Sequence, residues 1–167
     1  DLMTNMVGEF ADLQGLMGRY YALHDGEAPE VAEAIDDQYR PRFAGDELPR
    51  ANTGAVLAIA EKLDTLCGLF AIGQPPTGSK DPFALRRAAI GLLRIMIEKQ
   101  LDLDLKDCVD KAFAGLASLD DSLVDKSDTV KQQALEFLLD RLQAWSSDRG
   151  ISPGVFQSVM ALRPTRP

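Results

Sequence analysis

The chain has 167 residues, of which 46% are hydrophobic and 26% are charged, and its formal net charge at pH 7 is −8. A chain of this size and composition can bury a core, so we expect a globular protein of one domain or slightly more. No apolar run approaches the ~18 residues of a membrane-spanning helix, and no signal peptide is recognisable. We therefore expect a cytoplasmic protein that does not enter a membrane.

The negative charge is concentrated in the first third of the chain. Residues 1–49 hold 11 acidic and 3 basic side chains, and residues 50–167 hold 15 of each. Within the latter, residues 130–167 hold 3 acidic and 5 basic side chains. Binding to RNA requires only a local basic face. The overall acidity therefore excludes a general polyanion-binding domain but does not exclude an RNA partner.

Apolar residues recur at helical spacing along most of the chain. No segment alternates between apolar and polar residues with β-branched enrichment, and no internal repeat is visible. The pattern therefore predicts an all-α protein, a helical bundle with a C-terminal helical extension. In chain order we expect helices over residues 1–12, 29–40, 53–72, 82–95, 105–116, 128–149 and 153–162.

Residues 53–95 form the most apolar part of the chain, and we expect the other helices to pack around them. In the first helix of this hairpin, only Glu61, Lys62 and Asp64 interrupt the apolar pattern. Prolines and glycines then predict a turn over residues 73–80. Asp81 is expected to cap the second helix, with Pro82 in its first position. That second helix is expected to bury seven side chains: Phe83, Leu85, Ala88, Ala89, Leu92, Leu93 and Ile95.

Acidic residues in the apolar helices are candidate metal ligands. Glu61 and Asp64 are three residues apart and share one helix face, and Asp1 and Glu9 are further candidates. The alternative is a solvated acidic stripe. The chain has a single histidine, His24, so no imidazole cluster completes a metal site, and we expect none.

The usual catalytic groups are poorly represented. Cys67 and Cys108 lie in apolar helical patterns without Cys-x-x-Cys spacing, which predicts buried thiols rather than a disulfide or a metal site. Residues 73–80 have some character of a phosphate-binding loop but lack its Gly-Lys-Ser/Thr order, and a structural turn is the preferred interpretation. We therefore predict no catalytic residue.

Basic residues at two places are candidates for RNA contact. Lys80, Arg86 and Arg87 flank the start of a helix, where the dipole favours an anion. The alternative is that these arginines pair with nearby acids. Arg163 and Arg166 lie in a proline-rich tail with few acids nearby and suit a nucleic-acid backbone.

Four longer runs of the sequence carry a family resemblance. They are MVGEFADLQGLMGRYYA (6–22), AEKLDTL (60–66), GQPPTGSKDPFALRRA (73–88) and RPTRP (163–167). These runs resemble the beta subunit of bacterial glycyl-tRNA synthetase. The resemblance covers nearly the whole chain and is weakest over residues 101–128.

The resemblance implies an internal piece of a longer subunit that works with an alpha subunit, with the rest of the beta subunit and with glycine tRNA. In that family the alpha subunit uses ATP and magnesium to activate glycine, and the beta subunit mainly recognises tRNA. No cofactor is implied for this piece. The implied domains are a helical domain similar to HD phosphohydrolases over 1–117, a linker over 118–128, and the start of an anticodon-binding-like region over 129–167.

The same resemblance places Asp1, Glu61 and Asp64 at positions of a degenerate HD metal site. An HD hydrolase has Asp where this chain has Glu61, and no histidine cluster accompanies it, which favours a scaffold without hydrolase activity. We therefore expect a noncatalytic tRNA-recognition and scaffold segment of a glycine–tRNA ligase, inactive by itself. Two alternatives remain open at this stage, a residual metal-dependent phosphohydrolase and a structural spacer without RNA contact.

Overall fold

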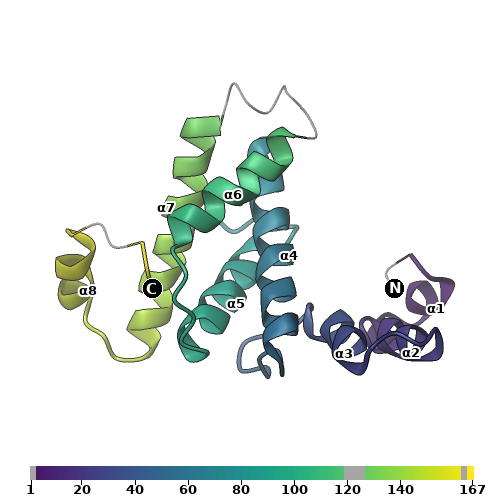
Figure 1. The fold of residues 1–167 in the computed structure, drawn as a ribbon. Coiled ribbons are helices and arrows are strands. Elements are labelled where there is room, and N and C mark those ends of the chain that lie inside the picture. The colour runs from purple at the N-terminus through teal and green to yellow at the C-terminus, as the bar shows by residue number, and fades with distance from the viewer. Residues whose placement is uncertain (1–2, 119–126, 163–164) are drawn as a thin grey trace. The chain divides into compact units, whose positions relative to one another are not determined.

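A computed structural model describes residues 3–118, 127–162 and 165–167. Regular structure in these residues is helical, with α-helices α1 to α8 and one 3₁₀ helix, η1 (Figure 1). The described residues contain no named strand, and a single isolated bridge joins Thr77 to Lys80. The predicted all-α class is confirmed, whereas the likeness to HD domains stays a prediction. The chain divides into two compact units, Asp1–Glu61 and Lys62–Pro167.

The first unit begins with two short helices rather than one. Thr4 caps α1 (Asn5–Glu9) by accepting a hydrogen bond from the Val7 amide. The backbone leaves the α-helical region at Phe10, and η1 (Ala11–Leu13) follows. The single helix predicted over residues 1–12 was therefore wrong in its second half.

Helices α2 (Leu16–His24) and α3 (Pro29–Asp37) pack against each other. Gly15, the N-cap of α2, has a φ of +85°, which only glycine adopts without strain. Pro29 stands in the first turn of α3, as the sequence predicted, because its missing N–H would be unpaired there in any case. Asp36 and Asp37 end α3, and both are buried.

These two carboxylates and three arginines form a network that we call the aspartate–arginine cluster (Asp36, Asp37, Arg40, Arg42 and Arg50). Asp37 accepts hydrogen bonds from the Arg50 amide (2.6 Å) and from its Nε (2.8 Å). Asp36 accepts from Arg42 Nη2 and Arg50 Nη2, both at 2.8 Å. Arg40 Nη2 lies 3.5 Å from Asp36. The cluster therefore ties the end of α3 to the loop that leads into α4 (Asn52–Ala71).

Two glycines make room for the cluster. A Cβ added to Gly54 would lie 2.6 Å from the Asp37 Cβ, and one added to Gly15 would lie 3.0 Å from Asp36 Oδ1. Real Cβ atoms do not approach other atoms so closely, so any side chain at Gly54 would displace Asp37. Glycine at these two positions therefore leaves the space that the buried acids occupy.

The buried and exposed positions of helix α4 differ from those that the sequence predicted. Lys62 was expected on a polar face with Glu61 and Asp64, but it is only 5% exposed. The reason is helical spacing, since Lys62 lies four residues from both Ala58 and Leu66, which are buried. Conversely, Val56 is 65% exposed. The boundary between the two units falls within this helix.

The second unit is held together around α7 (Ser127–Asp148), which packs against α5 (Leu85–Glu98), α6 (Leu105–Ala117) and α8 (Pro153–Met160). Phe70 of α4 meets Phe137 of α7 with ring centroids 5.4 Å apart. The sequence assigned the central place to residues 53–95 and did not predict this role of α7. Fully buried side chains of this unit include Leu66, Leu85, Leu92, Leu93, Ile95, Met96, Leu105 and Leu138.

The sequence predicts a helix cap at Asp104 and a helix start at Ser152-Pro153, and both are confirmed, whereas the start of α5 differs from its prediction. Asp104 accepts from the amides of Lys106 (2.9 Å) and Asp107 (3.1 Å) at the start of α6. Ser152 caps α8 and Pro153 stands in its first turn. Most of the predicted linker, residues 119–126, lies outside the described residues, so the predicted domain limits stay predictions. No helix in the described part of the chain is long and apolar enough to cross a membrane.

The aspartate–arginine cluster generates the first prediction. Replacing Asp37 by Ala should lower the free energy of unfolding of the first unit by about 3 kcal/mol, because it removes the buried acceptor of the Arg50 amide and Nε and leaves Asp36 alone to neutralise the arginines. Urea denaturation measures the change. Glu47→Ala is the control, since Glu47 binds Arg40 at 2.7 Å with an 83% exposed side chain, and its loss should cost under about 1 kcal/mol. Equal costs for the two variants would contradict a structural role for the cluster.

Candidate functional site

The turn between α4 and α5 and the first turn of α5 contain three of the predicted RNA-contact residues, Lys80, Arg86 and Arg87. Gly73 and Gly78 have φ values of +71° and +51°. Thr77 and Lys80 exchange two backbone hydrogen bonds, Thr77 N to Lys80 O at 3.1 Å and Lys80 N to Thr77 O at 2.8 Å. The backbone is therefore held in a tight reverse turn, as preferred from the sequence over a phosphate-binding loop.

The start of α5 differs from the prediction. The helix begins at Leu85, and its N-cap is Ala84 in the left-handed region (φ 54°), not Asp81. Asp81, three residues before the N-cap, still caps the helix, because its carboxylate accepts hydrogen bonds from the amides of Leu85 (2.8 Å) and Arg86 (3.0 Å). Pro82 therefore lies in a turn before the helix, where its fixed φ is equally suitable.

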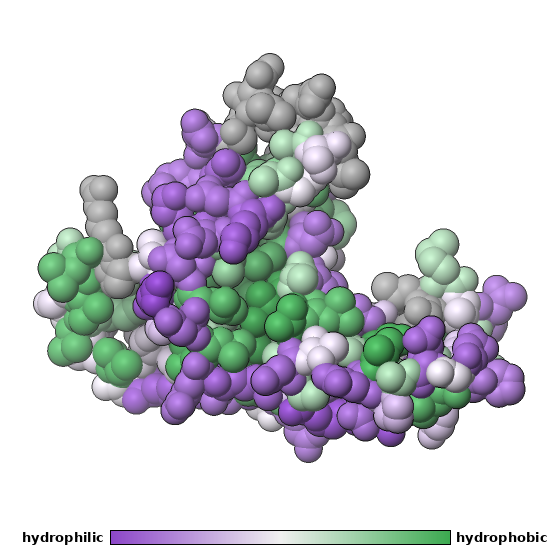
Figure 2. Space-filling model, in the orientation of Figure 1, coloured by the Kyte–Doolittle hydropathy of each residue, from purple (hydrophilic) through white to green (hydrophobic). Residues whose placement is uncertain are grey.

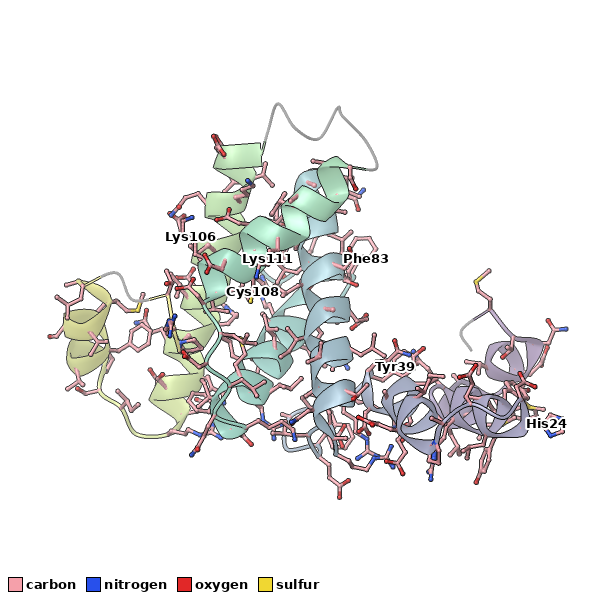
Figure 3. All side chains as sticks on the ribbon, in the orientation of Figure 1. His24, Tyr39, Phe83, Lys106, Cys108 and Lys111 are labelled. Carbon is pink, nitrogen blue, oxygen red and sulfur yellow. The ribbon has the colours of Figure 1, made fainter. Side chains whose placement is uncertain are left out.

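This turn places Phe83 outside the helix. The sequence predicted a buried Phe83, but the residue is 49% exposed. Its backbone lies inside the turn closed by the Ala84 amide and the Asp81 carbonyl (3.1 Å). The stick view labels Phe83 beside the helices of this unit (Figure 3). An exposed aromatic ring therefore lies between Lys80 and Arg87 in sequence, a feature that the sequence interpretation missed.

The three basic residues of this segment differ in role. Arg86 Nη2 donates to the Gly78 carbonyl at 2.6 Å, and Arg86 Nη1 lies 4.0 Å from Asp81. Arg86 therefore stabilises the turn. Lys80 and Arg87 are exposed. We call Lys80, Phe83 and Arg87 the turn surface.

The C-terminal tail is bound to the loop before α6. The Leu105 amide donates to the Thr165 carbonyl at 2.7 Å, and the Thr165 hydroxyl donates to the Asp104 carboxylate. The Thr165 hydroxyl is the largest cause of a lowered pKa of Asp104. Arg166 pairs with Asp102, and both side chains are largely exposed. Arg163 lies outside the described residues.

The predicted HD metal positions are not brought together by what the structure describes. Glu61 is half-buried and Asp64 is exposed on α4, and Asp1 lies outside the described residues. Within the described ranges, no three His, Cys, Asp or Glu side chains approach closely enough to hold a metal ion. His24 is exposed at the end of α2 (Figure 3). The metal positions therefore stay a prediction.

The two thiols are poor nucleophiles. Cys67 is fully buried, and burial raises its pKa to about 12, with the negative charge of Asp64 acting in the same direction. Burial also raises the pKa of Cys108, against an opposing effect of Lys111. A protonated thiol does not attack substrates. Both cysteines are free; the predicted burial is confirmed for Cys67, whereas Cys108 is only half-buried.

Comparison with known proteins identifies the family. Residues 1–161 match the family model described as glycyl-tRNA synthetase beta subunit. Relatives named glycine–tRNA ligase beta subunit from Haemophilus influenzae (strain PittEE), Ectopseudomonas mendocina (strain ymp) and Vibrio vulnificus (strain YJ016) are 56%, 57% and 54% identical over all 167 residues. The chain spans 24% of the length of each of these relatives. The chain belongs to the glycyl-tRNA synthetase beta subunit family.

Proposed function

We propose that this chain is a noncatalytic, tRNA-contacting segment of a glycine–tRNA ligase. Its relatives are named as beta subunits of that ligase, and the chain corresponds to 24% of their length. In the proposed enzyme, an alpha subunit activates glycine with ATP and magnesium, and this segment helps to position glycine tRNA. The observation that carries the proposal is the turn surface.

The turn surface offers the chemistry that RNA binding requires. Lys80 and Arg87 supply positive charges for phosphate oxygens, and the exposed ring of Phe83 can stack on an unpaired base. Arg86 and Asp81 hold the backbone of the turn on both sides of Phe83. Because these hydrogen bonds already fix the backbone of the turn, it loses little conformational entropy when RNA binds, and its side chains are well suited to a specific contact.

The tail offers a second, weaker contact. Arg166 pairs with Asp102 at an exposed site. Such ion pairs contribute little net stability, so a phosphate could replace Asp102 as the partner of Arg166. We retain Arg163 and Arg166 as candidate tRNA contacts on this basis. The alternative of a metal-dependent phosphohydrolase gains no support from the names of the relatives.

The noncatalytic assignment predicts that residues 1–167 alone do not catalyse glycine-dependent exchange of pyrophosphate into ATP. The reason is that in this exchange the glycine carboxylate itself attacks the α-phosphate of ATP, so activity requires a site that binds both substrates, and the proposal places that site in the alpha subunit. Isotope exchange with excess glycine and ATP measures the activity. The complete alpha–beta enzyme serves as the positive control. Exchange by the segment above the buffer background would refute the assignment.

The tRNA contact predicts a specific change in salt dependence. In a complete enzyme, the double variant Lys80→Ala and Arg87→Ala should bind glycine tRNA on the order of 10-fold more weakly at ~0.1 M salt, and the slope of log K against log salt should fall by about 1.5. Both changes follow from the loss of two phosphate contacts. Binding titrations at several salt concentrations measure them, and pyrophosphate exchange should be unaffected.

A matched control removes the same charge elsewhere. Lys106 lies in α6 and Lys131 in α7, and neither belongs to the turn surface. The double variant Lys106→Ala and Lys131→Ala should leave the salt slope nearly unchanged. If the turn-surface variant has the same tRNA affinity and the same salt slope as this control, the segment is a structural spacer without RNA contact. The additional change Phe83→Ala tests stacking, which should weaken binding without altering the slope.

A further inference from the structure

An apolar pocket opens in the second unit, where α7, α8 and the C-terminal tail meet. Its cavity volume is about 310 Å³. The walls come from the last turns of α7, from α8, from residues 165–167, and from Ile97 of α5 and Leu105 of α6. Apolar side chains of the lining include Leu142, Trp145, Ile151, Val155, Phe156 and Val159.

Helix α8 leaves unusually apolar surface exposed beside this pocket. It has no charged residue among its eight and no buried residue. Val155 and Val159 are 58% and 51% exposed, and Leu162 just after the helix is 84% exposed. Figure 2 shows the hydrophobic colour gathered over this helix. Contiguous apolar surface of this kind marks an interaction site.

One wall of the pocket is fixed in position. The Arg149 guanidinium lies 3.7 Å from the centre of the Trp145 ring, and Arg149 also pairs with Glu98 at 3.2 Å. The Trp145 indole N–H is buried, and no acceptor for it is found in the described part of the chain. Buried indole N–H groups usually have an acceptor. The N–H is enclosed by the protein's own atoms, so Trp145 offers the pocket apolar ring surface, and an occupant with an apolar side chain suits this wall.

The chemistry of the surface decides between classes of occupant. RNA is disfavoured over α8, which offers no cation to its phosphates. Among the described lining residues only Arg166 of the tail is charged, and it pairs with Asp102. A separate protein chain is disfavoured by size, because stable interfaces take about 20–30 residues from each partner. A segment of the same chain needs far less contact area, because its tether supplies a high effective concentration. The relatives contain other segments that could dock in this way, because residues 1–167 correspond to only 24% of their length.

We propose that the apolar pocket and the exposed side of α8 form the docking site for another segment of the same beta subunit, one that lies outside residues 1–167. The docked segment inserts an apolar side chain beside Leu142, Trp145 and Phe156. This inference rests on family membership and not on the turn surface; Arg166, which lines the pocket, is the one residue that it shares with the candidate tRNA contacts. Each can therefore fail without the other.

Photo-crosslinking in a complete alpha–beta enzyme tests the docking. A benzoylphenylalanine is introduced at Val159 in one variant and at Val155 in a second, so that the failure of one to assemble leaves the other. Irradiation should give an adduct within the beta subunit, and mass spectrometry of the digest should map it to residues outside this segment. Gln133, an exposed residue of α7, is the matched control position and should not give that adduct.

Other outcomes overturn the proposal. Adducts to the alpha subunit, to tRNA, or to a second beta subunit would assign the surface to a different occupant. Mixed enzyme prepared from isotopically light and heavy beta subunits separates adducts within one chain from adducts between two. Adducts confined to residues 1–167, or no adduct at either valine, would show that nothing from the rest of the subunit covers α8.

Discussion

Two neighbouring carboxylates are buried at the end of α3, and the first unit depends on how they are neutralised. Asp36 and Asp37 are 5% and 0% exposed. Removing one charge from water costs several kcal/mol, so such a pair persists only where cations and hydrogen bonds surround it. The cations come from the loop that follows α3, and Arg50 binds both acids. Charge neutralisation therefore determines the path of the chain into α4.

The second unit is stabilised differently. Its largest buried side chains are apolar, among them Leu66, Leu92, Leu93 and Met96, and burial of such side chains contributes about 1.5–3 kcal/mol each. Helical periodicity reveals this kind of stabilisation directly. The sequence therefore predicted α6, α7 and α8 closely, together with the caps at Asp104 and Ser152. It did not reveal the aspartate–arginine cluster, because ion pairs across a loop leave no periodic pattern.

The candidate site was predicted by residue type rather than by geometry. An Asp-Pro pair suits both a helix N-terminus and a turn, and only the packing of this segment selects the turn that exposes Phe83. Lys80, Arg86 and Arg87 were all identified as basic, yet Arg86 binds the Gly78 carbonyl. The pairing of Arg166 with Asp102 joins residues far apart in sequence. No local rule predicts such a contact.

The second unit carries two exposed surfaces with opposite chemistry. The turn surface is cationic with one aromatic ring, whereas α8 offers apolar side chains without a charge. A phosphate gains nothing from the α8 surface, and an apolar segment gains little from exposed lysine and arginine. Each surface therefore selects against the other's partner. A unit built in this way can be fixed within its own subunit by α8 and still present the turn surface to RNA.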